Sequence, residues 1–273
     1  MTYSLSSFLL ICLPVLISVA FFTLLERKVL RIVGFRLGPY KVSFLGFLQP
    51  IGDALKLANK RVNYLNSFSL FFYYVASFLI ILIRLTLFIC LNLTPSSISL
   101  KFSFLLFLLV LGFNSLNSVL AGWRAYRKFS LIGRIRTVSQ LISYEAVLFL
   151  CAFFLVLCYS SFDLSVGDFI GANLLFRVFV PCFFIWIPVI LAELNRTPFD
   201  FSEGERELVR GFNTEFGSGC FTLIFLAEYG RIIFFCTLRS VLFFSPFIFF
   251  FFFFSFFFWS EFDQYYPGFV LIN

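Results

Sequence analysis

The chain has 273 residues, of which 61% are hydrophobic and 22% aromatic, and it carries a net charge of +7 with no histidine. Soluble domains are about 45–50% apolar, so this composition, with a mean hydropathy of +0.99, excludes an ordinary soluble protein. The lack of histidine excludes bis-histidine haem ligation, histidine metal sites and histidine-dependent triads, and the scattered cysteines lack iron–sulfur spacing.

Apolar windows predict an all-α fold, a polytopic bundle of about seven transmembrane helices, because each span needs about 20 apolar residues. No second compositional regime appears, so residues 1–273 are expected to form a single membrane domain. The first stretch is too long for a signal-peptide core and is expected to be a genuine span. The predicted spans are 5–26, 68–93, 102–122, 140–160, 174–194, 217–239 and 241–260.

Basic residues concentrate in segments 27–67, 123–138 and 195–216, which share one side of the membrane if the spans alternate. The positive-inside rule places these segments inside and the N-terminus outside. Loops on the other side hold little beyond Lys101, Arg177 and Arg239. The orientation accounts for the net charge, so no nucleic-acid partner is expected.

Segment 45–60 has the pattern of a short amphipathic helix in the membrane interface. Leu48, Ile51, Leu55 and Ala58 recur there at helical spacing, which defines one apolar side. An ordinary packed loop helix is the alternative, and the pattern alone leaves both open.

The inside segment 193–216 is rich in carboxylates. Crowded carboxylates near low dielectric repel one another and lose solvation, which favours groups that exchange protons or respond to a nearby charge. A solvated loop of salt bridges is the alternative. The acids are Glu193, Asp200, Glu203, Glu205, Glu207 and Glu215.

Acidic residues also occur within the predicted spans. Glu145 and Glu228 lie inside two spans, and Glu193 ends a third. A charged carboxylate at mid-helix costs about 2.5–3.5 kcal/mol or more and is functional by default. Together these acids predict a proton-conducting or charge-relay path, whereas isolated acids bonded only for packing are the alternative.

Four motifs resemble those of one known family. They are ERKVLRIVGFRLGPYKVSFLGFLQPIGDALKLANK at 26–60, LIGRIRTVSQLISYE at 131–145, AELNRTPFDFSEGERELVRGFNTEF at 192–216 and FLAEYGRII at 225–233. Their order and spacing across residues 5–240 are similar to those of subunit 1 of respiratory complex I, the proton-pumping NADH:quinone oxidoreductase.

The resemblance implies a core membrane subunit that lines a quinone tunnel and couples quinone reduction to proton translocation. It implies no redox centre, metal or catalytic residue of the chain's own, and no covalently bound cofactor. Ubiquinone is expected as substrate, with flavin and iron–sulfur clusters on other subunits. The expected partners are hydrophilic quinone-site subunits, adjacent membrane-arm subunits and lipids. The expected location is the mitochondrial inner membrane, with a bacterial plasma membrane as the alternative.

The resemblance also assigns residues to two functional groups. The proton path comprises Glu145, Glu193, Asp200, Glu203, Glu205, Glu207, Glu215 and Glu228. The quinone tunnel comprises Glu26, Arg27, Arg36, Gln49, Asp53, Arg136, Arg196, Phe199 and Phe212.

Two arginines depart from the pattern of the family, which is uncharged at these positions. Arg231 follows Glu228 by three residues, within helical pairing reach, and a pair there would hold Glu228 ionised. Arg84 lies within the second span and must snorkel or meet an acid from a neighbouring helix.

Family members continue past the seventh span with a basic loop and an eighth span, whereas here only a short polar segment follows Ser260. A separate short chain is therefore expected to supply the eighth helix, near residues 241–260. Two rival functions remain at this stage. The membrane subunit of a proton-pumping hydrogenase shares much of the signature, and a stand-alone ion transporter would show an internal repeat, which is not visible.

Overall fold

The computed structural model describes residues 2–39, 42, 46–60, 70–91, 102–124, 128–159, 162, 164, 176–196, 198–200 and 218–243. Within these residues all regular structure is helical, which confirms the predicted all-α class. The helices are α1 (Thr2–Val33), α2 (Gln49–Ala58), α3 (Leu70–Cys90), α4 (Ser103–Arg124), α5 (Lys128–Tyr159), α6 (Phe176–Glu193) and α8 (Ser218–Phe243).

Three stretches of the described helices are long and apolar enough to cross a membrane: Ser103–Trp123, Leu131–Leu157 and Gly219–Ser240. Tyr74–Cys90 and Pro181–Glu193 form shorter apolar helices. Helices satisfy their backbone N–H and C=O groups internally, which a lipid environment demands of any spanning segment. The described residues therefore build a multi-pass membrane helix bundle.

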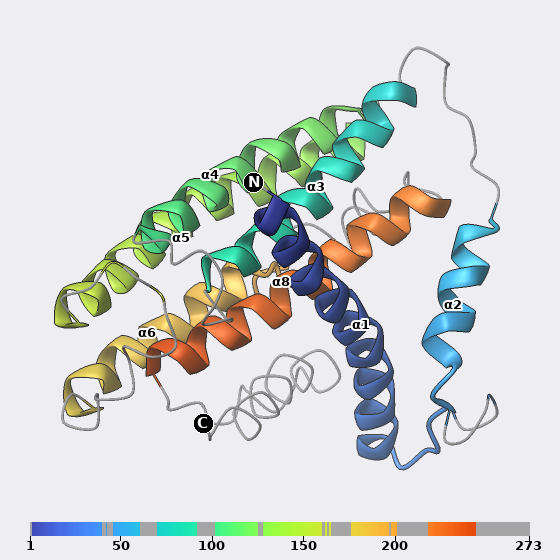
Figure 1. Ribbon diagram of the computed structural model, residues 1–273, viewed down its shortest axis with the longest axis horizontal. Helices are drawn as coiled ribbons and strands as arrows, with labels where there is room; N and C mark the ends of the chain where they lie inside the picture. The colour runs from blue at the N-terminus through green and yellow to red at the C-terminus, as the bar shows by residue number, and fades with distance from the viewer. Residues whose placement is uncertain are drawn as a thin grey trace.

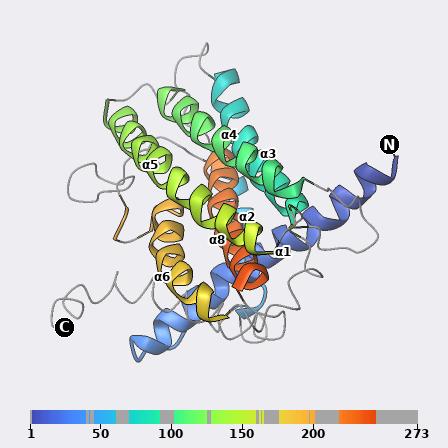
Figure 2. The same cartoon turned by 90° about the vertical axis from the view of Figure 1, so that its left-hand side faces the viewer.

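Helix α8 lies at the centre of this bundle, where it contacts α1, α2, α3 and α6 (Figures 1 and 2). Helices α3, α4, α5 and α6 pack in chain order, each against the next. Helix α1 crosses the direction of α3, α4 and α5 steeply in Figure 1. This arrangement brings the end of α6 and the middle of α8 together.

The core of the bundle is largely aromatic. Phe234 of α8 packs edge-on against Phe88 of α3, with ring centroids 5.6 Å apart, and lies 5.8 Å from Phe107 of α4. Trp186 of α6 is fully buried. Lipid tails are as apolar as these side chains, so the hydrophobic effect does not drive the helices together in a membrane. Close packing of the rings stabilises the bundle instead.

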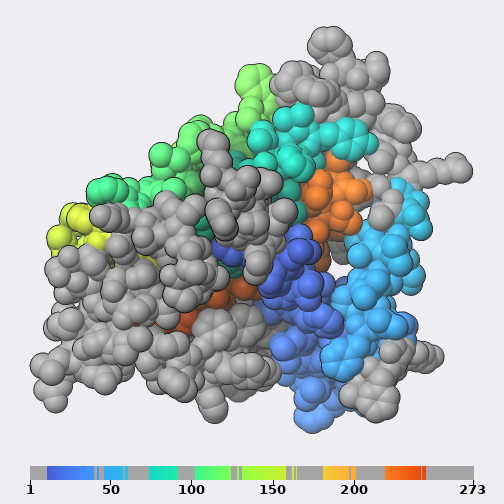
Figure 3. Space-filling model, in the orientation of Figure 1, coloured from blue at the N-terminus to red at the C-terminus, as the bar shows by residue number. Residues whose placement is uncertain are grey.

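Helix α2 exposes its apolar side. Leu48, Ile51 and Leu55 are 51–60% exposed, whereas Asp53 on the other side reaches α1. Figure 3 shows α2 lying beside α1 at the edge of the molecule. An outward apolar stripe is unfavourable in water and favourable at a lipid interface, so this orientation fits the predicted interfacial helix.

Helices α1 and α6 end in the same way. Asn195 has a φ of 51°, and the backbone N–H of Arg196 donates to the carbonyl of Leu191 (3.2 Å), which is a Schellman end. Phe35 has a φ of 52° in the equivalent place after α1. The turn after α6 holds Glu193 in the last helical turn and directs Arg196 back toward the bundle.

Two predicted loop boundaries were wrong. Helix α5 begins at Lys128, so the supposed basic loop 123–138 is largely helical and its Arg134 is buried. Arg239, expected in an outer loop, is buried within α8, which continues to Phe243. In both cases the helix carries an arginine that the bundle covers, so charge alone did not mark a loop. Most of the predicted seventh span lies outside the described residues, so the separate eighth-helix chain stays a prediction.

Candidate functional site

The first group of predicted tunnel residues joins α1 to α2. A guanidinium nitrogen of Arg27 donates to one carboxylate oxygen of Asp53, and the amide of Gln49 donates to the other at 2.9 Å. Arg27 is half-exposed, whereas Asp53 is more covered. The structure thus brings together three of the predicted tunnel residues at the junction of the two helices.

A second group connects α1 with α8. Tyr229 is 9% exposed, and its hydroxyl interacts with Glu26 of α1 and with Arg196. The guanidinium of Arg196 also lies over the Tyr229 ring, 5.6 Å from its centroid. Tyr229 was not among the residues predicted from sequence, although its place next to Glu228 in FLAEYGRII was a usable signal.

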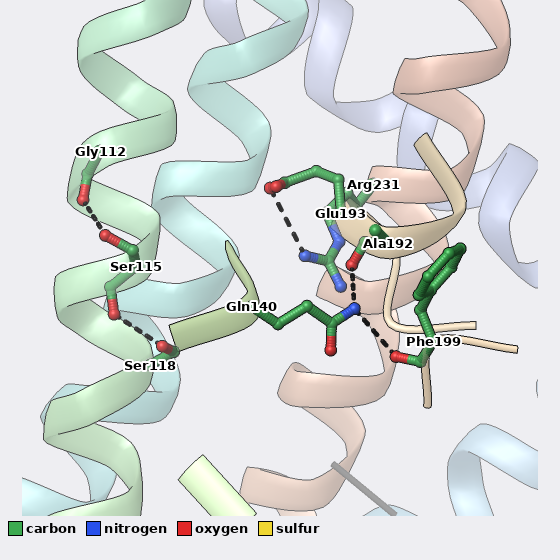
Figure 4. Close-up of polar contacts among 8 residues, drawn as sticks. All are labelled: Gly112, Ser115, Ser118, Gln140, Ala192, Glu193, Phe199 and Arg231. Carbon is green, nitrogen blue, oxygen red and sulfur yellow. Dashed lines mark hydrogen bonds and ion pairs between the residues drawn. The ribbon is translucent and has the colours of Figure 1, made fainter. Parts of the chain in front are cut away.

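The third group is centred on Glu193. Glu193 and Arg231 are each 3% exposed, and Oε1 of Glu193 lies 3.9 Å from Nη1 of Arg231 (Figure 4). The sequence instead predicted that Arg231 pairs with Glu228, its neighbour on the same helix. That prediction was wrong, because the ion pair crosses from α8 to α6, while Glu228 acts on Arg231 only through longer-range electrostatics.

Two further buried arginines converge on these acids. Arg84 of α3 interacts electrostatically with Glu193, Glu228 and Arg231. Arg134 of α5 interacts with Glu228 and Arg231. Both arginines are 8% exposed, so the bundle covers them, and Arg84 lies within electrostatic range of acids on α6 and α8.

Glu145, on α5, faces α4. A Cβ built on Gly112 would lie 3.6 Å from the Oε1 atom of Glu145, which places the carboxylate against the backbone of α4. Glu145 also acts electrostatically on Glu193. Glu145 and Glu193 therefore belong to one electrostatic group although they come from different helices.

Gln140 fixes the segment that follows α6. Its side-chain Nε2 donates to the carbonyl of Ala192 at 2.8 Å and to that of Phe199 at 2.9 Å (Figure 4). One turn along α5, Tyr144 packs against the Phe199 ring with centroids 5.3 Å apart. Sequence reasoning missed Gln140, although it is the one amide side chain in α5.

The remaining predicted residues are not all placed. Arg36 and Arg136 are exposed, and Asp200 is half-buried just after the Phe199 contact. Within the described parts of the chain, no three His, Cys, Asp or Glu side chains are grouped to hold a metal. Glu203, Glu205, Glu207, Phe212 and Glu215 lie outside the described residues.

The groups form a continuous series of interactions across the bundle. Glu26 interacts with Tyr229, and Tyr229 with Arg196, at the α1 side. Arg196 and Arg231 then interact electrostatically, and Arg231 pairs with Glu193. From Glu193 the series reaches Glu145. The series links groups on α1, α8, α6 and α5 and on the segment that follows α6.

Comparison with known proteins agrees with this geometry. The chain matches the NADH dehydrogenase family over residues 6–267. It is 39% identical to NADH-ubiquinone oxidoreductase chain 1 of Aedes aegypti over 90% of this chain and 79% of that protein. The chain belongs to this family of complex I subunit 1 proteins.

Other members of the family are similarly related. The Locusta migratoria chain 1 is 41% identical over 87% of this chain and 76% of its own length. The Lampetra fluviatilis chain 1 is 37% identical over 90% of this chain and 77% of its own length. As a complex I subunit 1, the chain is a multi-pass component of an oxidoreductase complex, and the other complex I subunits are its partners.

Proposed function

We propose that this subunit lines the quinone tunnel of NADH:ubiquinone oxidoreductase and couples quinone reduction to proton translocation through its buried carboxylates. The observation that carries the proposal is the unbroken series of interacting groups from Glu26 on α1 to Glu145 on α5. The first member lies next to Arg27 and the α1–α2 junction, and the last lies within an apolar span.

The α1–α2 junction supports the tunnel assignment. Asp53 is held by Arg27 and Gln49, so α2 keeps its polar side on α1 while its apolar stripe faces outward, toward lipid. A quinone combines a polar ring with a long apolar tail, and it enters from lipid. A junction with charged groups on one side and apolar surface on the other suits both parts of such a molecule.

The relay would act through charge. Reduction of a quinone draws protons and changes the local charge near the tunnel. Two unit charges 4 Å apart interact by about 4 kcal/mol at the effective dielectric near a protein surface, so each group in the series responds to its neighbour. Tyr229 and Arg196 would transmit the change from Glu26 to Arg231, and Arg231 would transmit it to Glu193.

The same proposal assigns the surroundings of the chain. Ubiquinone is the substrate, and the flavin and iron–sulfur clusters belong to other subunits. Hydrophilic quinone-site subunits, adjacent membrane-arm subunits and lipids of the mitochondrial inner membrane are the neighbours. The whole chain acts as one membrane domain.

A photoreactive ubiquinone analogue tests the tunnel assignment in the assembled complex. We expect labelled peptides from residues 26–60 of this subunit, with labelling suppressed by excess ubiquinone. A matched analogue without the quinone ring controls for labelling by lipid-like tails. Labelling confined to other subunits, or unaffected by competing ubiquinone, would contradict the tunnel assignment.

A further inference from the structure

One end of the bundle is closed by a residue that belongs to no helix. Leu164 follows α5 in the chain, yet it is only 1% exposed, whereas connecting segments ordinarily run over the surface. Leu164 and apolar side chains of α4, α5, α6 and α8 surround a space that is too small to hold a water molecule. The connection after α5 therefore reaches into the bundle and fills the gap between four helices.

The hydroxyl of Ser103, at the start of α4, holds Leu164 in place. The backbone N–H of Leu164 donates to Oγ of Ser103 at 2.7 Å, and the same hydroxyl donates to the carbonyl of Phe162 at 3.5 Å. The backbone N–H of Phe104 donates to that carbonyl at 3.2 Å. Ser103 is fully buried. The backbone on either side of Leu164 is thus bonded to α4, which satisfies polar groups that would otherwise have to bind water.

Leu164 lies away from the buried ion pair of Glu193 and Arg231. Its neighbour Trp186 precedes Glu193 on α6, and its neighbour Leu238 follows Arg231 on α8. Both separations are about two helical turns, or roughly 10 Å along the helix axis. The two helices therefore place Leu164 on the same side of the ion pair, toward the end of the bundle where α4 begins and α8 ends.

The residues that surround Leu164 cannot carry a proton past it. They are apolar except for the indole N–H of Trp186, which donates a hydrogen bond but does not accept one. Arg239, next to Leu238 on α8, is buried, and a guanidinium does not release its proton. Water does not fit the space, and a charge in apolar surroundings is costly. An apolar region therefore separates the charged series from this end of the bundle.

We propose that Leu164 and the apolar side chains around it form a seal that stops protons from crossing the bundle by way of the charged series. Ser103 positions Leu164 within the seal. Narrow hydrophobic constrictions block ions in channels because they exclude water. A subunit of a proton pump needs such a barrier, since an open path would let protons return down their gradient. The seal goes beyond the proposed function, because it is needed whether or not this subunit lines the quinone tunnel.

Passive proton permeability tests the seal in vesicles that contain the assembled complex, without NADH or quinone. A potassium diffusion potential drives protons inward, and a pH-sensitive dye inside the vesicles reports their flux. We expect Leu164→Asn to raise the flux several-fold, because the amide binds water where leucine excludes it. Leu164→Met, which keeps an apolar side chain of similar size, should leave the flux low.

Ser103→Ala is the second variant, because it removes the hydrogen bonds that position Leu164 and leaves the apolar side chains intact. It should also raise the flux, and it tests the proposal even if Leu164→Asn lowers assembly. Unaltered permeability in assembled complexes that carry Ser103→Ala or Leu164→Asn would overturn the proposal.

Leu105→Asn is the matched control. Leu105 lies beside Phe104 at the same end of α4, but it is half-exposed on the outside of the bundle. The same substitution there should leave the flux unchanged, and an equal rise would contradict the seal. Photolabelling by the ubiquinone analogue is a separate measurement, so failure of the tunnel assignment would leave the seal standing.

Discussion

Glu193 at the end of α6 and Arg231 in the middle of α8 form a buried ion pair, with Oε1 and Nη1 3.9 Å apart. The pair joins the segment that leads into the acidic loop to the central helix of the bundle. It lies midway in the series of groups between Glu26 and Glu145, so its stability and its charge both bear on function.

Removing one member of this pair should cost more than removing both. Arg231→Met leaves Glu193 with one fewer cation, and Glu193→Gln leaves Arg231 uncompensated. Breaking a buried pair costs about 3–5 kcal/mol, whereas replacing both charges is often near neutral. We expect each single variant to lower the amount and thermal stability of assembled complex and the double variant to recover much of it. Additive losses would show that the two residues do not interact.

Gln140→Leu should loosen the segment after α6. The change leaves the carbonyls of Ala192 and Phe199 without their donor, and a buried unsatisfied group costs about 1–3 kcal/mol. We expect a lower unfolding temperature of the complex and lower quinone turnover. Limited proteolysis should cut more readily after residue 198.

The matched control for Gln140 is Ser139→Ala on the same helix. Ser139 is exposed and bonds only the carbonyl of Arg136 in its own helix. This variant should behave like the unaltered protein. Equal effects of the two substitutions would show that helix α5 is sensitive at any position. That result would contradict a specific role for the two Gln140 hydrogen bonds.

Gly122→Ala should push α4 and α5 apart. A Cβ at this position would lie 2.2 Å from Cγ and 2.4 Å from Cβ of Arg134, and the position of that Cβ is fixed by the backbone of α5. Overpacking of this kind costs about 1–3 kcal/mol. Thermal unfolding of the complex should detect the loss.

Gly230→Ala is the control for the glycine substitution. Nothing lies within 4 Å of a Cβ built there, and alanine in a helix interior is favoured over glycine by about 0.5–1 kcal/mol. Unchanged or raised stability is expected. A loss equal to that of Gly122→Ala would mean that the contact with Arg134 is not the cause.

Asp53→Ala should affect quinone use more than stability. The Arg27–Asp53 pair is partly exposed, and such pairs contribute about 0–1 kcal/mol. The complex should therefore assemble normally, while the KM for ubiquinone rises because α2 loses its ion pair with Arg27 of α1. Lys56→Ala, an exposed change on the same helix, should leave the KM unaltered. An unchanged KM in Asp53→Ala would remove the junction from the tunnel.

Asp200→Asn should lower NADH:ubiquinone turnover and proton pumping together. Asp200 directly follows Phe199, which Gln140 and Tyr144 hold against α5. Its position in the chain therefore keeps it close to the proposed series of charged groups. The amide keeps the shape and removes the charge. Proton pumping in vesicles and NADH oxidation are measured on the same preparation. Normal values of both, in a fully assembled complex, would exclude Asp200 from the coupling path.

Much of the site was visible in the sequence. Acids such as Glu145 and Glu228 stood out because a charge is costly in an apolar span, and the LNRTPFDFSEGE run indicated the family. The amphipathic pattern of 45–60 likewise predicted α2 and its apolar stripe. Each of these is a local property of the chain, so no knowledge of packing was needed.

The sequence did not reveal which residues contact one another across different helices. Arg231 was matched with Glu228 by helical spacing, yet it pairs with Glu193 because the rotation of α8 against α6 decides which acid it meets. The same dependence on packing hid Gln140 and buried Arg134 in what charge alone indicated was a loop. Hydropathy and motif order therefore determined the membrane fold and the family, since a spanning helix satisfies its own backbone within a single segment. Only the tertiary structure decided which buried charges balance one another, because that balance depends on side chains that meet across different helices.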